Sequence, residues 1–209
     1  MQSEILLFSN VFLLGLRHGF DWDHLAALSD IVGTSTAGGA TTSSAQTIKL
    51  STSYIVGHAT VVVLLGAAVI FAGNFMPPWL DAIMERAVGI TLIGLAGWLV
   101  YTIVRRTHSH RHEVRAYGVA TTFGVGMLHG IGAETGTQML LLASIGGAGN
   151  ASLAMCLLLV FVIGLLISNS LIAIAGIAGF TAARFGNAAN VLGFTTAAFS
   201  VAVGVKLLL

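Results

Sequence analysis

Residues 151–179 read ASLAMCLLLVFVIGLLISNSLIAIAGIAG and contain no Asp, Glu, Lys or Arg. A helix that crosses the hydrocarbon core of a bilayer needs about 20 mostly apolar residues, so this stretch is long enough to span a membrane. The rest of the chain has the same character, because 56% of its 209 residues are hydrophobic and 8% are charged. A typical soluble domain carries about 25% charged residues. The composition therefore predicts an integral membrane protein.

Five further segments are also long and apolar enough to cross a bilayer. The six predicted spans are residues 4–33, 51–73, 82–104, 117–145, 151–179 and 187–209. The 26 glycines and two prolines suit closely packed helices better than a β-barrel. We therefore predict an all-α, polytopic membrane protein with six transmembrane helices in a single domain, residues 1–209.

Composition also excludes several classes of protein. A net charge of +1 provides no basic surface for nucleic acid. The single cysteine, Cys156, lies in an apolar run, which excludes a disulfide framework and a CxxC site. The N-terminus lacks a basic region, so we expect no cleaved signal peptide. The sequence has no GxxxxGK[ST] motif and therefore no P-loop for ATP.

Positive charge predicts the orientation of the chain. Basic residues of the odd-numbered loops are Lys49, Arg105, Arg106, Arg111, Arg115 and Arg184. Because Lys and Arg are enriched in cytoplasmic loops, we expect these loops in the cytoplasm, both termini outside, and the chain in the cytoplasmic (inner) membrane. The first loop, residues 33–53, is rich in Gly, Ser and Thr. It is either flexible chain or a re-entrant segment that lines a cavity.

A weak internal duplication divides the chain into halves. At an offset of 111 residues, the matched pairs are Gly15 and Gly126, His18 and His129, Gly19 and Gly130, Asp23 and Glu134, and His58 and Asn169. Three spans in each half would make the second half inverted, a common transporter plan. We predict repeat 1 over about 4–104, a His/Arg-rich loop over 105–116, and repeat 2 over about 117–209. The alternative is chance similarity between Gly-rich helices.

The first span carries most of the polar chemistry, in the sequence RHGFDWDH at residues 17–24. Two Asp and one Arg at a helix centre would cost roughly 8–10 kcal/mol if unpaired, so the cluster must be paired, hydrated or bound to an ion. Arg17 and Asp21 share a helix face and could neutralise each other. Asp23 has no obvious local partner. A straight helix would separate His18, Asp23 and His24 by large angles, whereas a break near Gly15 or Gly19 would let them converge.

These side chains favour a borderline transition metal. Imidazole with one carboxylate suits Ni²⁺, Co²⁺ or Zn²⁺, whereas Ca²⁺ and Mg²⁺ take more oxygen ligands. His58 and His129 add two more histidines within predicted spans. We therefore predict a metal or proton pathway and not a set of helix-packing histidines.

Three motifs resemble the nickel/cobalt transporter family (NiCoT). Residues 18–24 (HGFDWDH) fit its HX4DH signature, residues 57–62 (GHATVV) resemble its GHxTVV motif, and residues 131–138 (IGAETGTQ) resemble its LGFDTATE motif. Their order and placement on successive helices agree, so the resemblance spans most of the chain. Many family members have an additional helix before the signature helix.

The sequence also departs from the family pattern. Glu134 stands where the third motif has Asp, and Gln138 stands where it has Glu. Ser168 and Asn169 occupy positions where a later acidic motif has Asp. These departures leave open the identity of the metal, the affinity for it and the direction of transport.

The resemblance implies roles for particular residues. His18, Asp23 and His24 would bind or relay metal, and His58 would face them from the second span. Asn169 would be an oxygen ligand or an orienting group, and Asp21 could instead hold Arg17. The full set of candidate metal residues is His18, Asp21, Asp23, His24, His58, His129, Glu134 and Asn169.

The third predicted loop has alternating histidines in the sequence THSHRHE, residues 107–113. Such a tract can hold a borderline metal loosely. The alternative is a solvated polar loop anchored by arginines. Neither interpretation distinguishes metal uptake from efflux.

These features together predict a secondary transporter, not an enzyme, that moves Ni²⁺ or Co²⁺ as its substrate. We expect no permanent cofactor and no nucleic-acid partner. Its partners would be the dication and the lipid bilayer, and a homo-oligomer is left open. Uptake is favoured over efflux. Two less favoured functions are an intramembrane metalloenzyme and a subunit of a larger transporter, although no GxSG protease motif occurs.

Overall fold

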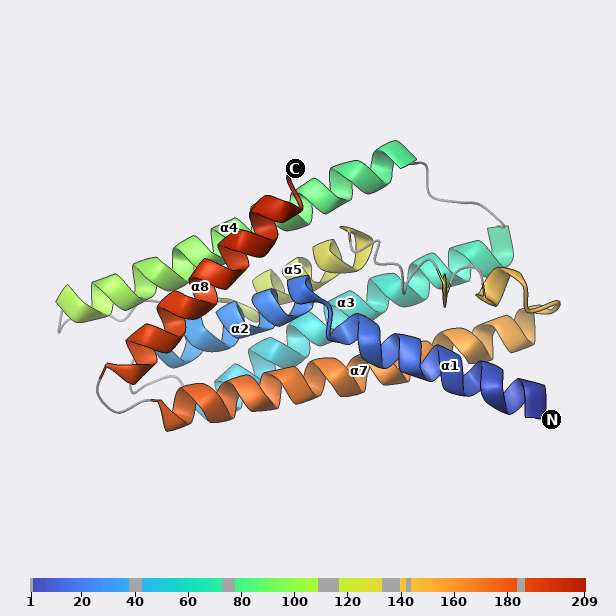
Figure 1. The fold of residues 1–209 in the computed structure, drawn as a ribbon, viewed down its shortest axis with the longest axis horizontal. Helices are drawn as coiled ribbons and strands as arrows, with labels where there is room; N and C mark the ends of the chain where they lie inside the picture. Colours follow the sequence, from blue (N-terminus) through green and yellow to red (C-terminus); the bar gives the residue numbers. More distant parts are fainter. Residues whose placement is uncertain are drawn as a thin grey trace.

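The structure, a computed structural model, describes residues 2–37, 43–72, 78–108, 117–132, 140–141, 144–183 and 187–209. The elements within these ranges are helices packed side by side (Figure 1). They are α1 (Gln2–Gly19), α2 (Trp22–Ala37), α3 (Ser44–Ala72), α4 (Pro78–His108), α5 (Val119–Gly132), α7 (Ala151–Ala182) and α8 (Ala188–Lys206). The predicted all-α class is confirmed for this part of the chain.

Four helices are long and apolar enough to cross a membrane. The candidate spans are Ser44–Phe71, Glu85–Arg105, Ala151–Ala182 and Ala188–Lys206. The apolar part of α5, Val119–Ile131, is shorter, and the predicted fourth span continues into residues 133–139, outside the described ranges. These observations support a polytopic helical membrane protein with four candidate spans among the described residues.

The first predicted span, residues 4–33, is two helices and not one. α1 ends at Gly19 and α2 begins at Trp22, and the turn between them lies midway along the bundle (Figure 1). Gly19 is required here because a Cβ atom would overlap the Ser168 hydroxyl of α7. The helix break favoured by the sequence is therefore present.

The first predicted loop, residues 33–53, is largely helical. α2 continues to Ala37, and α3 already begins at Ser44. The hydroxyls of Ser35 and Thr36 donate to backbone carbonyls one turn earlier, those of Ile31 and Val32. Hydroxyl-rich sequence is thus accommodated within helix, because each hydroxyl bonds its own backbone. In the described parts of this segment, residues 33–37 and 43–53, the prediction of flexible chain is wrong, whereas the alternative of a re-entrant segment stays a prediction.

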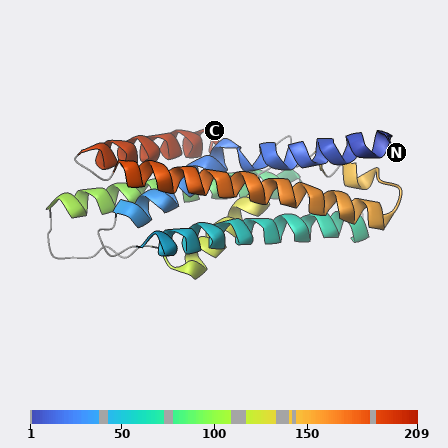
Figure 2. The same cartoon turned by 90° about the horizontal axis from the view of Figure 1, so that it is seen from below.

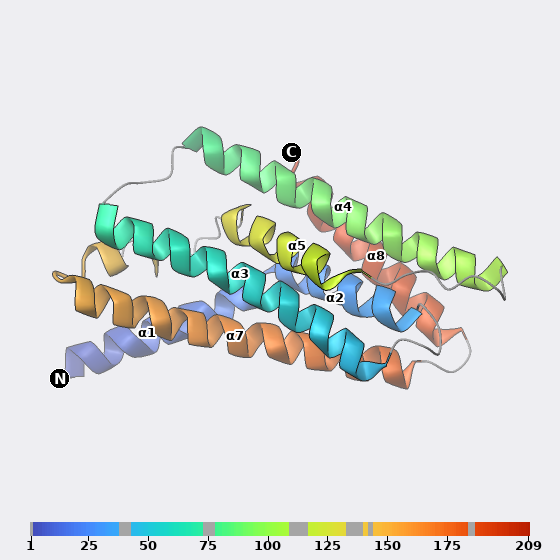
Figure 3. The same cartoon turned by 180° about the vertical axis from the view of Figure 1, so that it is seen from behind.

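The helices pair across the chain. α1 lies along α7, α3 along α5, and α4 along α8, while Figure 3 shows α2 in the middle of the bundle beside α3, α4 and α8. From below, α7 lies between α1 and α3 (Figure 2). The N-terminus of α7 is capped by Asn150, whose side chain accepts a hydrogen bond from the Leu153 N–H at 2.8 Å.

Two glycines set the closest helix approaches. A Cβ atom on Gly15 would overlap the Phe161 carbonyl of α7, and one on Gly126 would overlap the Tyr54 carbonyl of α3. Small residues allow backbones to meet in this way in membrane proteins. The two glycines are 111 residues apart, but Tyr54 and Phe161 are 107 apart. The predicted positional match between His58 and Asn169 is therefore displaced by about one helical turn.

Candidate metal centre

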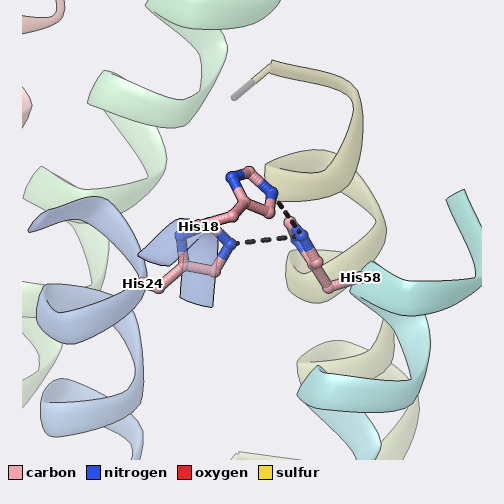
Figure 4. A group of neighbouring side chains, drawn as sticks. All are labelled: His18, His24 and His58. Carbon is pink, nitrogen blue, oxygen red and sulfur yellow. Dashed lines mark hydrogen bonds between the residues drawn. The ribbon is translucent and has the colours of Figure 1, made fainter. Parts of the chain in front are cut away.

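Three buried histidines meet where α1, α2 and α3 come together. Figure 4 shows the rings of His18, His24 and His58 converging. Nε2 of His58 lies 3.2 Å from Nε2 of His24 and 3.4 Å from Nε2 of His18. All three side chains have no exposed surface. One nitrogen from each ring lies within 4.8 Å of the others, so we call this group the His trio.

Two carboxylates fix the orientation of two of these rings. Nδ1 of His18 lies 3.2 Å from the Asp21 carboxylate, and Nδ1 of His24 lies 3.1 Å from the Asp23 carboxylate. A carboxylate only accepts hydrogen bonds when ionised, so each Nδ1 carries the donated proton. In the neutral ring the Nε2 atom is then an acceptor. Both rings therefore present a lone pair toward the centre of the trio.

The three rings do not carry enough N–H protons at the centre of the trio to hydrogen-bond every contact between their nitrogens. One proton on Nε2 of His58 can be donated to Nε2 of His24 or to Nε2 of His18, but not fully to both. In the other contact, two nitrogen atoms meet without a good hydrogen bond between them. A cation at the centre would relieve this arrangement. Around a tetrahedral ion with metal–nitrogen bonds of about 2.0–2.1 Å, neighbouring ligand nitrogens lie about 3.3 Å apart. The two spacings from His58, 3.2 and 3.4 Å, match that value, and the nitrogens of all three rings lie within 4.8 Å of one another.

The helix break explains how the trio forms. His18 lies in the last turn of α1, and His24 lies in the first turn of α2. The intervening turn is closed by hydrogen bonds from the Phe20 N–H to the Arg17 carbonyl and from the Asp21 N–H to the His18 carbonyl. This turn places both carboxylates behind the rings they bond. The arrangement is that of carboxylate–histidine–metal sites, in which the carboxylate orients the ligand.

Charge at the site suits a dication. A histidine binds a metal ion through its neutral ring. With neutral rings, the largely buried Asp23 carboxylate places negative charge beside the trio. Buried charge is costly unless it is balanced, and a divalent cation bound at the trio would balance it.

The other predicted residues are not members of the His trio, although His129 lies close enough to Asp23 and His24 to interact electrostatically. His129 is buried on α5, its Nδ1 donates to the Val125 carbonyl at 2.9 Å, and its ring lies 5.6 Å from that of Tyr54. Its Nε2 has no hydrogen-bond partner within the described residues. Asn169 is also buried, and neither polar atom of its amide finds a partner in the same ranges. Glu134 and the loop histidines His110 and His112 lie outside the described residues.

Asp30 was missed by the sequence reasoning. It is fully buried on α2, and neither of its carboxylate oxygens makes a hydrogen bond of good geometry among the described residues, although the Ser200 hydroxyl of α8 lies nearby. Its signal in the sequence was a lone acid in an apolar span, seven residues after Asp23. Intramembrane acids of this kind usually have a functional reason.

Comparisons of the chain with protein-family models, curated proteins and solved structures found no match. The interpretation of the site therefore depends on its own geometry and on the motif resemblance.

Replacing Asp23 with asparagine should weaken Co²⁺ binding by roughly 10–100-fold, the usual effect of losing a carboxylate that orients a metal-binding histidine. The substitution keeps the shape of the side chain and removes its negative charge. Titration of the purified protein, followed by the visible absorption of Co²⁺, measures the affinity. The matched control is Glu85→Gln, because Glu85 is an exposed acid on α4. An Asp23→Asn affinity equal to that of the control would contradict an orienting role.

Proposed function

We propose that this protein is a secondary transporter that moves a borderline transition-metal dication, Ni²⁺ or Co²⁺, across the cytoplasmic membrane. The convergence of the three Nε2 atoms of the His trio is the observation that carries the proposal. Imidazole nitrogen selects Ni²⁺, Co²⁺ and Zn²⁺ over Ca²⁺ and Mg²⁺. The motif resemblance favours nickel or cobalt among these ions.

A site of this kind suits transport more than structure. Two of its ligands, His18 and His24, flank a break in a helix midway along the bundle. Transporters commonly place their ion sites at discontinuous helices near the membrane midplane. A short movement of α1 against α2 would separate two of the three ligands and release the ion.

We further propose six crossings in two inverted halves. In this scheme α1 and α2 form the first crossing, α5 begins the fourth, and the remaining long helices form the others. The packing of the helices supports the scheme, because helices of the first half pack on helices of the second: α1 packs on α7, and α3 packs on α5. The equivalent close contacts of Gly15 and Gly126 also support it. Both termini would then face outward, with the basic loops in the cytoplasm.

The membrane potential can supply energy for uptake. A dication that moves inward through 100 mV gains about 4.6 kcal/mol, twice the value for a single charge. Uptake is therefore the favoured direction.

Reconstituted protein should carry ⁶³Ni²⁺ and ⁵⁷Co²⁺ into liposomes, and an inside-negative potential should accelerate the flux. Removing His24 in the His24→Ala variant should reduce the flux to the level of empty liposomes, because one of three nitrogen ligands is lost. The control is Trp22→Ala, since Trp22 lies beside the site on α2 with an exposed side chain. Flux favoured by an inside-positive potential would instead indicate efflux. Absence of flux in correctly folded wild-type protein would refute the transporter proposal.

A further inference from the structure

A row of buried polar side chains leads away from the His trio. Its members on α3 are Thr47, Ser51 and Tyr54, and its members on α2 are Asp30 and Thr34. All five side chains are buried. Within the part of the chain that the structure describes, their hydroxyl and carboxylate oxygens make no hydrogen bond of good geometry, although the Ser200 hydroxyl lies near Asp30 and the Tyr117 hydroxyl lies near Thr34. Buried polar groups are normally paired, so each exception requires an explanation.

The α3 members share one helix face with His58. They precede it by four, seven and eleven residues, and at 100° per residue they point within about 40° of its direction. Thr47 lies about 16 Å from His58 along the helix axis. The hydroxyls therefore form a line that begins at the trio and descends toward the start of α3.

The α2 members share one face with Asp23. Asp30 and Thr34 follow it by seven and eleven residues, and both point within about 20° of its direction. Asp30 lies about 10 Å from Asp23 along the axis. This second line also begins at the trio and runs toward the end of α2.

Several contacts bring the two lines together. α2 packs against α3, and Asp23 lies close enough to Tyr54 to interact electrostatically. Tyr117, just before α5, interacts with both Thr34 and Asp30, and the Ser53 hydroxyl of α3 donates to the nearby Val119 carbonyl at 2.7 Å. The two lines thus approach the same end of the bundle between α2, α3 and the start of α5.

That end is the basic one. The last turn of α2, the first turn of α3 and the last turn of α4 lie at the same end of the molecule in Figures 1 and 3. Exposed Lys49 and Arg105 belong to these helices. In the orientation proposed above, this end faces the cytoplasm.

We propose that Asp30 and the hydroxyls of Thr34, Thr47, Ser51 and Tyr54 form an oxygen-lined path for the transported cation between the His trio and the basic end of the bundle. This inference rests on the proposed function. Neutral hydroxyls bind a borderline dication weakly and can replace part of its hydration shell, so the ion can leave the nitrogen ligands without being trapped. Asp30 supplies the negative charge that a dication needs partway along an apolar interior.

The Asp30→Asn variant tests the path separately from the site. In proteoliposomes its Co²⁺ flux should fall at least about tenfold, because Asp30 is the charged residue among the five named members of the path. Equilibrium Co²⁺ binding at the His trio should stay within about threefold of the wild type, since Asp30 is about two helical turns from the ligands. Thermal stability should be unchanged or higher, because the variant replaces a buried carboxylate that makes no well-formed hydrogen bond among the described residues with a neutral amide that can still face the nearby Ser200 hydroxyl. A purely structural residue would lose stability and binding together.

A pair of serines gives the matched control. Ser51→Ala removes an unpartnered hydroxyl from the path, whereas Ser35→Ala removes a buried hydroxyl that already donates to the Ile31 carbonyl at 2.8 Å. Flux should fall in the first variant and stay near wild type in the second.

The outcomes are distinguishable. If the wild-type protein moves Co²⁺ and the Asp30→Asn variant moves it equally fast, the path is refuted and the proposed function stays intact. Equal Co²⁺ flux in Ser51→Ala and Ser35→Ala would show that the hydroxyl groups are not part of the proposed path. Wild-type protein that neither binds nor moves Co²⁺ would refute the proposed function itself.

Discussion

Replacing His58 with alanine is expected to weaken Co²⁺ binding by more than about 100-fold, beyond the range seen when only an orienting group is lost. Nε2 of His58 is the atom that joins the other two rings, at 3.2 and 3.4 Å. Its removal leaves two nitrogen ligands. His58 also has no carboxylate partner in the described contacts, so its loss leaves no acid unpaired. Titration monitored by Co²⁺ visible absorption measures the change.

A control on the same helix separates ligand loss from loss of structure. Leu64 is largely exposed on α3, at 59% of its maximal surface, so it would face lipid and not the site. Leu64→Ala should bind Co²⁺ as the wild type does. If His58→Ala retained wild-type affinity while the protein remained folded, the His trio would not be the binding site.

Replacing Gly126 with alanine is expected to destabilise the protein by about 3 kcal/mol, at the upper end of overpacking effects. For a chain of this size, that corresponds to a fall of roughly 6–12 °C in melting temperature. The added methyl group would overlap the Tyr54 carbonyl and would lie 3.0 Å from the His58 backbone nitrogen. The clash must push α3 away from α5, so Co²⁺ affinity should also fall. Thermal unfolding in detergent measures the stability change.

Gly124, two residues earlier on α5, provides the control. A Cβ atom there would meet nothing within 4 Å, so Gly124→Ala should be neutral or stabilising by up to about 1 kcal/mol through higher helix propensity. Gly15→Ala should resemble Gly126→Ala, since it meets the Phe161 carbonyl in the same manner. Equal melting temperatures for Gly124→Ala and Gly126→Ala would contradict the close α3–α5 packing.

The sequence indicated where the first span could break. Charged residues in an apolar segment require partners, and a straight helix does not easily direct His18, Asp23 and His24 at one point. A break near Gly15 or Gly19 would let them converge, and α1 ends at Gly19. The flexible chain predicted over residues 33–53 was wrong in the described parts of that segment, because composition does not show whether hydroxyls will bond their own helix.

The placement of the acids could not be predicted in the same way. Spacing alone allowed Asp23 to be a metal ligand and Asp21 to be a partner of Arg17. In the structure the turn at residues 20–21 directs both carboxylates to Nδ1 atoms. That outcome depends on the geometry of a short turn, for which side-chain periodicity gives no information.

What the sequence by itself determined is local. Long apolar runs specified membrane helices, and each helix's periodicity specified which residues share a face, including the line from Thr47 to His58. Only the tertiary structure decided which faces meet. The register between α3 and α5 depends on where Gly126 lets two backbones touch, and the register between α1 and α7 on Gly15. A shift of one turn along such a contact would leave every helix's own pattern unchanged but would carry His58 past His18 and His24. Close contact between backbones, and not the apolar pattern, therefore fixes helix register in lipid.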